Sequence, residues 1–209
     1  MALRWAAAGH QVFIGSRSID RAQTAAQTIQ KAVGPNSKVS GLLNDQACAA
    51  AEIVVVTVPF AALAETLKTV RPSLTPGKIL VNVTVPLETA VGGKPTRTLG
   101  LWAGSAAEVA SNAVPKGVIV VTAFNNVSAE PLSDLSQKIE CDVLVCGDDR
   151  EGKKTVIELV SSIPGARGVD AGPLENSRTV EQITALLVGM NIRYGVRSAG
   201  IRVTGLPVT

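Results

Sequence analysis

The sequence predicts an α/β protein with a doubly wound, mostly parallel sheet and a small C-terminal helical extension. Short apolar runs alternate with helical patterns along most of the 209 residues, which is typical of strands joined by helical crossovers. Hydrophobic residues make up 46% of the chain and aromatic residues only 3%, so Ala, Val, Leu and Ile predominate. Such residues suit a sheet covered by helices on both faces. The length favours one large domain, or one domain with a small appendage.

Five apolar runs are predicted to be strands, because each is short, rich in β-branched residues and followed by a breaker or a polar residue. These runs are Gln11–Ile14, Ile53–Val58, Ile79–Val83, Val118–Val121 and Val143–Val145. Since helical patterns separate most of them, we expect parallel pairing with right-handed crossovers.

Helix signals lie between and after these runs. Ser18 precedes an amphipathic pattern that Gly34 ends, and Ser105 opens a segment with the spacing of a capping box. The other predicted helices are Ala61–Val70, Glu151–Ile163 behind two acidic residues, and the long segment Asn176–Arg197. The tail Ser198–Thr209 is expected to be a loop or a short edge strand.

Charge and cysteine content restrict the class of partner. Twenty Lys and Arg against 17 Asp and Glu give a net charge of +3, which is too mild to indicate nucleic acid or a membrane surface. No run of about 18 apolar residues is present. The three cysteines, Cys48, Cys141 and Cys146, form no C-x-x-C pair. We therefore expect a cytoplasmic protein with free, packed thiols and small-molecule partners.

The end of the first predicted strand carries a phosphate-binding signal. In dinucleotide-binding sheets the second strand ends beside the adenosine ribose, where an acidic residue selects NAD and an arginine accommodates the 2′-phosphate of NADP. Here Ser16, Arg17 and Arg21 stand at that place and no acidic residue does. A hydroxyl, two guanidinium groups and a helix N-terminus suit a phosphate. A plain turn with a solvated arginine is the competing interpretation, and the position between strand and amphipathic helix favours NADP.

The glycine-rich turn that should accompany this signal is not found. A strand and a G-x-G-x-x-G turn are expected about 20 residues before the end of the second strand. Residues 1–10 instead read as the remainder of a first helix that Gly9 ends. We therefore expect a dinucleotide-binding domain without its N-terminal strand and pyrophosphate loop. A start assigned too late, a shortened chain or an altered protein would each account for this.

Several motifs together resemble those of the F420-dependent NADP reductases, which pass hydride between NADP and the deazaflavin coenzyme F420. The similarity covers nearly the whole chain, and its motifs occur in the same order and spacing. They are Gly9-His10 with Gly15-Ser16-Arg17, Thr57-Val58-Pro59-Phe60, Ser105-Ala106-Ala107-Glu108, Val145-Cys146-Gly147-Asp148-Asp149 and Asp170-Ala171-Gly172-Pro173-Leu174 with Asn176-Ser177-Arg178.

This resemblance implies a Rossmann-like oxidoreductase that works as a homodimer. It implies an NADP-binding domain over residues 1–147, a C-terminal subdomain over residues 148–209, and two sets of ligand contacts. NADP is expected at Ser16, Arg17, Arg21, Thr57 and Pro59, and coenzyme F420 or a flavin-like partner at Asn125, Val127, Ser177 and Arg178. Asn125 departs from the family, which carries a histidine there. The second ligand could therefore be another flavin-like acceptor or a different substrate.

Hydride transfer between two bound rings requires neither a catalytic side chain nor a metal, because the cofactors carry the chemistry. We accordingly predict no catalytic residue and no metal site. Two other functions remain open: a non-catalytic dinucleotide-fold binding module, and a dehydrogenase of a small hydroxy or imino acid. The latter needs a proton donor, for which Lys94 and Lys116 are the candidates.

Overall fold

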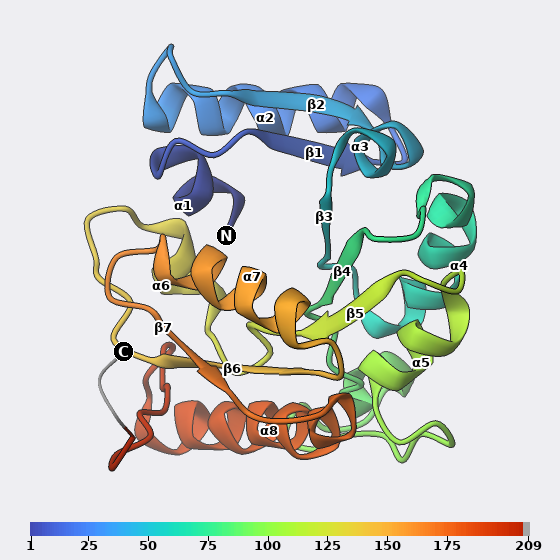
Figure 1. The fold of residues 1–209 in the computed structure, drawn as a ribbon. Helices are drawn as coiled ribbons and strands as arrows, with labels where there is room; N and C mark the ends of the chain where they lie inside the picture. Colours follow the sequence, from blue (N-terminus) through green and yellow to red (C-terminus); the bar gives the residue numbers. More distant parts are fainter. Residues whose placement is uncertain (207–209) are drawn as a thin grey trace.

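Seven strands form two sheets in the computed structural model, which describes residues 1–206 (Figure 1). A parallel pair joins β1 (Val12–Ser16) to β2 (Val39–Leu43). The second sheet has the order β3-β4-β5-β6-β7, with all pairs parallel except β5–β6. Its strands are β3 (Ile53–Val56), β4 (Ile79–Asn82), β5 (Ile119–Thr122), β6 (Asp142–Gly147) and β7 (Arg167–Asp170). The predicted α/β class with a mostly parallel sheet is confirmed.

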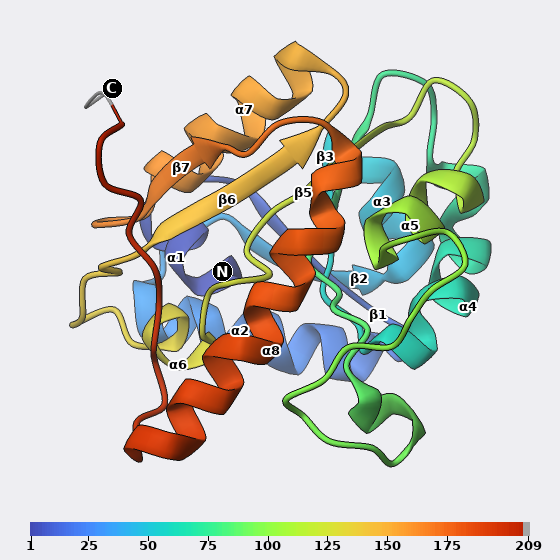
Figure 2. The ribbon, with the colours of Figure 1, turned by 90° about the horizontal axis from the view of Figure 1, so that it is seen from below.

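Helices cover these sheets on both sides. In Figure 1 the β6–β7 part of the sheet lies between α7 above it and α8 below it, and Figure 2 shows α8 starting beside the end of β6 and running obliquely away from that strand. The helices are α1 (Ala2–Ala7), α2 (Ile19–Val33), α3 (Asn44–Ala50), α4 (Phe60–Val70), α5 (Ala106–Ala113), α6 (Ala129–Ser133), α7 (Arg150–Ser161) and α8 (Ser177–Tyr194). Three short 3₁₀ segments add η1 (Arg71–Ser73), η2 (Glu88–Val91) and η3 (Leu174–Asn176). No helix within residues 1–206 combines the length and apolar character needed to cross a bilayer.

All five predicted strands are present with small differences at their ends, and so are the predicted helices. Ser18 lies at the N-cap position of α2, although its hydroxyl makes no capping bond there, whereas the Ser105 hydroxyl accepts the Glu108 N–H at 3.0 Å. The described part of the tail, residues 198–206, is irregular, and residues 207–209 lie outside the described residues. The sheet continues past residue 147 into β7, and the domain division at that residue stays a prediction.

The sequence does not predict the strands β2 and β7 or the short helices α3 and α6. Gly41 interrupts the apolar character of β2, because the backbone of α2 lies so close that a Cβ there would stand 2.3 Å from the carbonyl carbon of Ala22. β7 is a four-residue strand with an arginine at one end and an aspartate at the other. Neither segment carries the alternating or continuous apolar pattern that identifies a strand.

The thiols are buried and unpaired, as predicted. Cys48, Cys141 and Cys146 are all free cysteines that lie in the interior. Cys146 packs with Leu144 and Val180 in the apolar layer between β6 and α8. They therefore behave as small apolar residues, which is the common role of a free cysteine.

A fully buried carboxylate joins the end of the chain to the sheet. Asp142, the first residue of β6, accepts hydrogen bonds from Arg167 Nε at 2.9 Å, from Arg202 Nη1 at 3.2 Å and from the Val203 N–H at 2.7 Å. The Arg167 side chain is the main cause that lowers the pKa of Asp142 below its usual range. Since a buried charge is tolerated only when it is well partnered, this cluster fixes the tail segment at the edge of β6.

Asp142→Asn is expected to lower the free energy of unfolding by about 3 kcal/mol at neutral pH, because it leaves two guanidinium groups without their buried partner. Urea denaturation followed by circular dichroism measures this loss. The pKa of Asp142 is depressed in the folded state, so its contribution is present above the unfolded pKa and lost as pH falls through the folded value. The gap between wild type and variant should therefore shrink in strong acid.

The exposed Asp45 in the first turn of α3 provides the matched control. Asp45→Asn removes only a favourable interaction with a helix N-terminus and should cost less than about 1 kcal/mol. Equal losses for the two variants would contradict the role given to Asp142.

Candidate functional site

The turn after β1 presents two exposed guanidinium groups. Ser16 is the last residue of β1, and its Oγ accepts the Ser18 N–H at 3.2 Å. Arg17 and Arg21 flank the start of α2, and both are exposed. Within residues 1–206 neither forms a salt bridge. A hydroxyl, two free cations and the N-terminus of a 15-residue helix therefore lie together in the sequence segment predicted to hold a phosphate.

The turn after β3 is exposed and tied to its neighbour. Thr57 follows the strand, and Pro59 occupies the N-cap position of α4. Both residues are exposed. The hydroxyl of Thr84, just beyond β4, donates to the carbonyl oxygen of Val58 at 3.1 Å. The carboxyl ends of β3 and β4 are thus joined at the edge of the sheet where ligands of open α/β proteins bind.

Asn125 lies at the centre of a buried polar network. Its Oδ1 accepts from the Thr122 hydroxyl at 3.0 Å, and its Nδ2 donates to the Thr84 carbonyl at 3.2 Å. Its own carbonyl accepts from the Thr184 hydroxyl of α8 at 2.8 Å. Only 5% of the residue is exposed. Asn125 therefore links β5, the β4 turn and α8, and both the oxygen and the nitrogen of its side-chain amide have hydrogen-bond partners within the protein.

The network continues into β4 through Asn82, which is completely buried. Its Nδ2 donates to the Thr84 carbonyl at 3.1 Å, and its own carbonyl lies 3.0 Å from the Thr122 hydroxyl, whose single proton it shares with Asn125 Oδ1. Its Oδ1 has no hydrogen-bond donor among the described residues. A buried amide oxygen without a donor lowers the stability of the folded state, so the other contacts of Asn82 must compensate for this loss.

The turn that carries Asn125 has an unusual backbone. Phe124 has φ of 64°, and it is the one non-glycine residue with positive φ among the described residues. The ring of Phe124 meets that of Trp5 edge to face, with centroids 5.6 Å apart. Val127 is partly buried and packs against the same apolar cluster. Aromatic packing therefore stabilises a strained turn at the end of β5.

The start of α8 is fixed by an ion pair and not by a cap. Arg178 donates from Nε to the carboxylate of Glu108 at 2.9 Å, and the Arg178 hydrogen bond is the main cause that lowers the pKa of Glu108. Ser177 is completely buried, and its hydroxyl has no partner among residues 1–206. Asn176 lies at the N-cap position, but its Nδ2 donates backwards to the Ala171 carbonyl at 2.7 Å.

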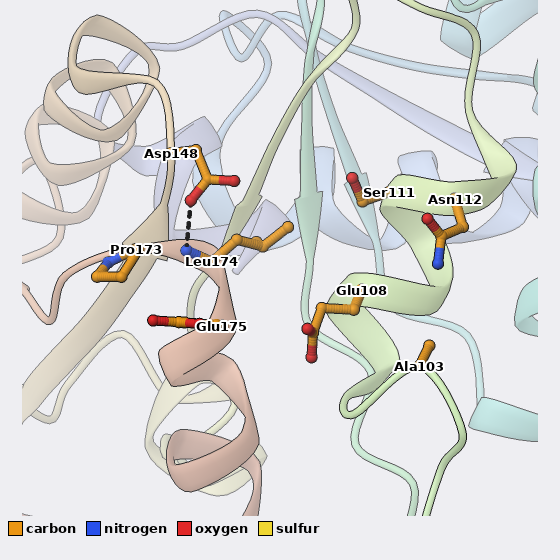
Figure 3. Close-up of a pocket in the computed structure, with 8 residues that line it drawn as sticks. All are labelled: Ala103, Glu108, Ser111, Asn112, Asp148, Pro173, Leu174 and Glu175. Atoms are coloured by element: carbon orange, nitrogen blue, oxygen red, sulfur yellow. Dashed lines mark hydrogen bonds between the residues drawn. The ribbon is translucent and has the colours of Figure 1, made fainter.

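Two grooves flank this ion pair. The first, called the α8 groove, has a volume of about 240 Å³ and is lined by Pro86, residues 98–101, Gly104 and, from α8, Arg178, Glu181 and Gln182. The second has about 290 Å³, and Figure 3 shows the Glu108 carboxylate of α5 pointing into it from one side, while the Glu175 side chain on the other side points away. In this second groove Asp148 accepts the Leu174 N–H at 2.9 Å.

Sequence reasoning missed Glu181, which is 2% exposed in the second turn of α8. Its carboxylate accepts the N–H groups of Ala106 and Ala107 at 2.9 and 3.1 Å. A signal was available, because an acidic residue follows Val180 directly on the buried side of a predicted helix. A charge in that place requires a partner, and here the partner is the N-terminus of α5.

The predicted site residues thus fall into two groups. Ser16, Arg17, Arg21, Thr57 and Pro59 lie at the ends of β1 and β3 and leave polar or charged groups accessible. The second set, Asn125, Val127, Ser177 and Arg178, gathers around the end of β5 and the start of α8, and of these four Arg178 lines the α8 groove. No cluster of three or more His, Cys, Asp or Glu suited to a metal occurs in the described part of the chain.

The chain is similar to proteins of one family over nearly its whole length. The family model "NADP oxidoreductase coenzyme F420-dependent" matches residues 1–86. The F420-dependent NADP reductase of Methanothermobacter thermautotrophicus is 43% identical over 99% of this chain and 90% of its own length. The enzyme of the same name from Methanocaldococcus jannaschii is also 43% identical, over 100% of this chain and 93% of its own.

The solved structures agree on the fold. A crystal structure from Arthrobacter sp. FB24 superposes with a TM-score of 0.79 and covers 97% of this chain and 94% of its own, at 23% identity. That identity supports the architecture alone, whereas the curated relatives are similar enough in sequence and length to define the family. The chain belongs to the F420-dependent NADP reductases.

Proposed function

We propose that this protein transfers hydride between NADP(H) and coenzyme F420. The proposal rests mainly on 43% identity to relatives that carry the name F420-dependent NADP reductase and that this chain matches over at least 90% of their length. The nicotinamide and the deazaflavin supply the hydride chemistry when they are bound. The protein must bind both, orient them and exclude water from the space between them.

The residues at the end of β1 fit the adenosine phosphate of NADP. Arg17 and Arg21 are permanently charged, exposed and free of carboxylate partners within residues 1–206, so a phosphate need not displace an existing ion pair. The Ser16 oxygen accepts the Ser18 N–H, so the proton of the Ser16 hydroxyl remains available for donation to a phosphate. Thr57 and Pro59 border the next strand end. The 19 glycines of the chain form no G-x-G-x-x-G, so the residues for the pyrophosphate are not assigned.

The second ligand is proposed to lie along the α8 groove. Arg178 is the cation of its lining, and its pairing with Glu108 orients the guanidinium from one side. Asn125 is buried and fixes the strand ends, and Ser177 is buried at the helix start. Val127 packs beside them. In this arrangement Asn125 does not contact the ligand but positions the backbone at the end of β5.

Other functions have less support. None of the relatives reported above is described as a non-catalytic binding module. A hydroxy- or imino-acid dehydrogenase would need a proton donor facing the ligand, but Lys94 and Lys116 are exposed and line neither groove. Hydride transfer between two cofactors does not require a lysine that donates a proton.

A homodimer and a cytoplasmic location complete the proposal. Leu186, Met190 and Tyr194 are 62%, 41% and 69% exposed, and their i, i+4, i+8 spacing makes one apolar ridge on α8. The same ridge on a second copy would cover it in an isologous contact. Three unpaired cysteines support a reducing compartment.

Arg17→Ala is expected to weaken NADPH binding at least tenfold, because it removes a charge-assisted hydrogen bond to the 2′-phosphate. NADPH fluorescence titration measures the dissociation constant. NADH lacks that phosphate, so its affinity should not change. Lys31→Ala, at an exposed position in the last turn of the same helix, is the control. Equal losses for NADH and NADPH would contradict the placement of the phosphate at this turn.

Addition of NADPH to the protein and oxidised coenzyme F420 should bleach the visible absorbance of the deazaflavin, with one NADPH consumed for each coenzyme reduced. Stopped-flow absorbance follows both species. Protein that binds NADPH without any bleaching would rule out the reductase and leave the binding module.

Met190→Glu is expected to convert a dimer into a monomer, because it places a charge in the apolar ridge of both copies. Light scattering after gel filtration gives the mass. The control is Glu65→Gln on the exposed side of α4, which should leave the mass unchanged. A monomeric wild type would refute the dimer.

A further inference from the structure

Glu181 holds two helices together from inside the protein. It belongs to α8, and both of its carboxylate oxygens accept backbone N–H groups from the first turn of α5, at 2.9 and 3.1 Å. The next N–H of α5 is accepted by the hydroxyl of Ser105. Free N–H groups at the first turn are thus satisfied in part by a carboxylate that comes from 75 residues further along the chain.

The residue that carries this carboxylate also lines the α8 groove. Glu181 and Arg178 are the charged residues that line it, one turn apart on α8. Arg178 donates its hydrogen bonds to Glu108, so it does not pair with Glu181. Glu181 therefore lines the groove while two backbone N–H groups of α5 are the hydrogen-bond partners of its carboxylate.

The surroundings raise the affinity of Glu181 for a proton. Burial raises its pKa to about 7, the N–H groups of Ala106 and Ala107 oppose this, and the negative charge of Glu108 adds to it. The charged and titratable groups that face it are Glu108 of α5, Arg178 of α8 and Cys146 of β6. The Cys146 thiol is neutral near pH 7, because burial raises its pKa to about 11.

We propose that Glu181 is a positioning residue that takes up a proton from water when an anionic deazaflavin enters the α8 groove and releases it when the ligand leaves. The proposal rests on the proposed function, because it takes coenzyme F420 as the occupant. The step involves only the carboxylate and a solvent proton: Glu181 changes from carboxylate to carboxylic acid, and no other bond forms or breaks.

Two effects of the ligand drive this uptake. A ligand in the groove replaces water beside the carboxylate and so increases the desolvation that already favours the neutral form. A negative charge on the ligand acts in the same direction as Glu108. The protonated side chain keeps one carbonyl oxygen as an acceptor for α5, so the link between the two helices persists.

The linkage has a defined sign. Below the pKa of the free protein Glu181 is already protonated, and ligand binding takes up no proton from this group. Above it, binding is accompanied by uptake of up to about one proton, so the affinity should fall as pH rises, by up to about tenfold per pH unit. The effect should begin near pH 7, where the free carboxyl titrates.

Calorimetric titration with coenzyme F420 in buffers of different ionisation enthalpy measures the number of protons taken up. Wild-type protein should take up a fraction of a proton at pH 8 and distinctly less at pH 6. Glu181→Gln should remove this pH dependence while binding persists. Glu158→Gln, at an exposed position on α7, should behave as wild type.

Wild-type protein that binds coenzyme F420 with the same proton uptake at pH 6 and pH 8 would overturn the inference and leave the proposed function intact. Retention of the full pH dependence in Glu181→Gln would overturn it as well. The wild-type comparison decides the matter if the variant fails to fold. Failure of wild-type protein to bind coenzyme F420 would overturn both proposals.

Discussion

The need of a buried amide for hydrogen-bond partners determines how the central part of this protein is arranged. Asn125 meets that need with contacts to Thr122, Thr84 and Thr184, which come from β5, the end of β4 and α8. Each partner can satisfy Asn125 only if its own element is in place. The carboxyl ends of the central strands and the C-terminal helix are consequently set relative to one another by a single side chain and its carbonyl.

The second link between α8 and the rest of the protein passes through α5. Arg178 and Glu181 lie one turn apart, and one binds a carboxylate of α5 while the other binds its first N–H groups. Gly104 allows this close approach, since a Cβ there would stand 2.2 Å from Arg178 Nε and the residue has φ of 105°. A groove for a ligand and the contacts that shape it therefore arise from the same few residues.

The sequence is sufficient for the α/β class, the main strands and the long helices, because their apolar periodicity reflects burial directly. It is insufficient where tertiary contact replaces periodicity. Gly41 belongs to a strand only because α2 approaches it, and Glu181 is buried only because α5 supplies two N–H groups. Such partners lie far along the chain and leave no local pattern.

The site shows the same division. Local signals identify Arg17 as an accessible cation, since a turn between strand and helix is exposed in nearly any arrangement. The roles of Asn125 and Arg178 depend on what they meet in three dimensions. Both were predicted as ligand contacts, and both are engaged by the protein itself, one in a buried network and one in an ion pair.

The packing of the cysteines has a practical consequence. Cys48, Cys141 and Cys146 are buried, and burial raises the pKa of each thiol, so the reactive thiolate is scarce and shielded at neutral pH. Maleimide dyes and spin labels would find almost nothing to attack. The chain therefore gives little background labelling. A single surface cysteine introduced beside the 92–98 loop could carry a label that measures how distances change when the cofactors bind.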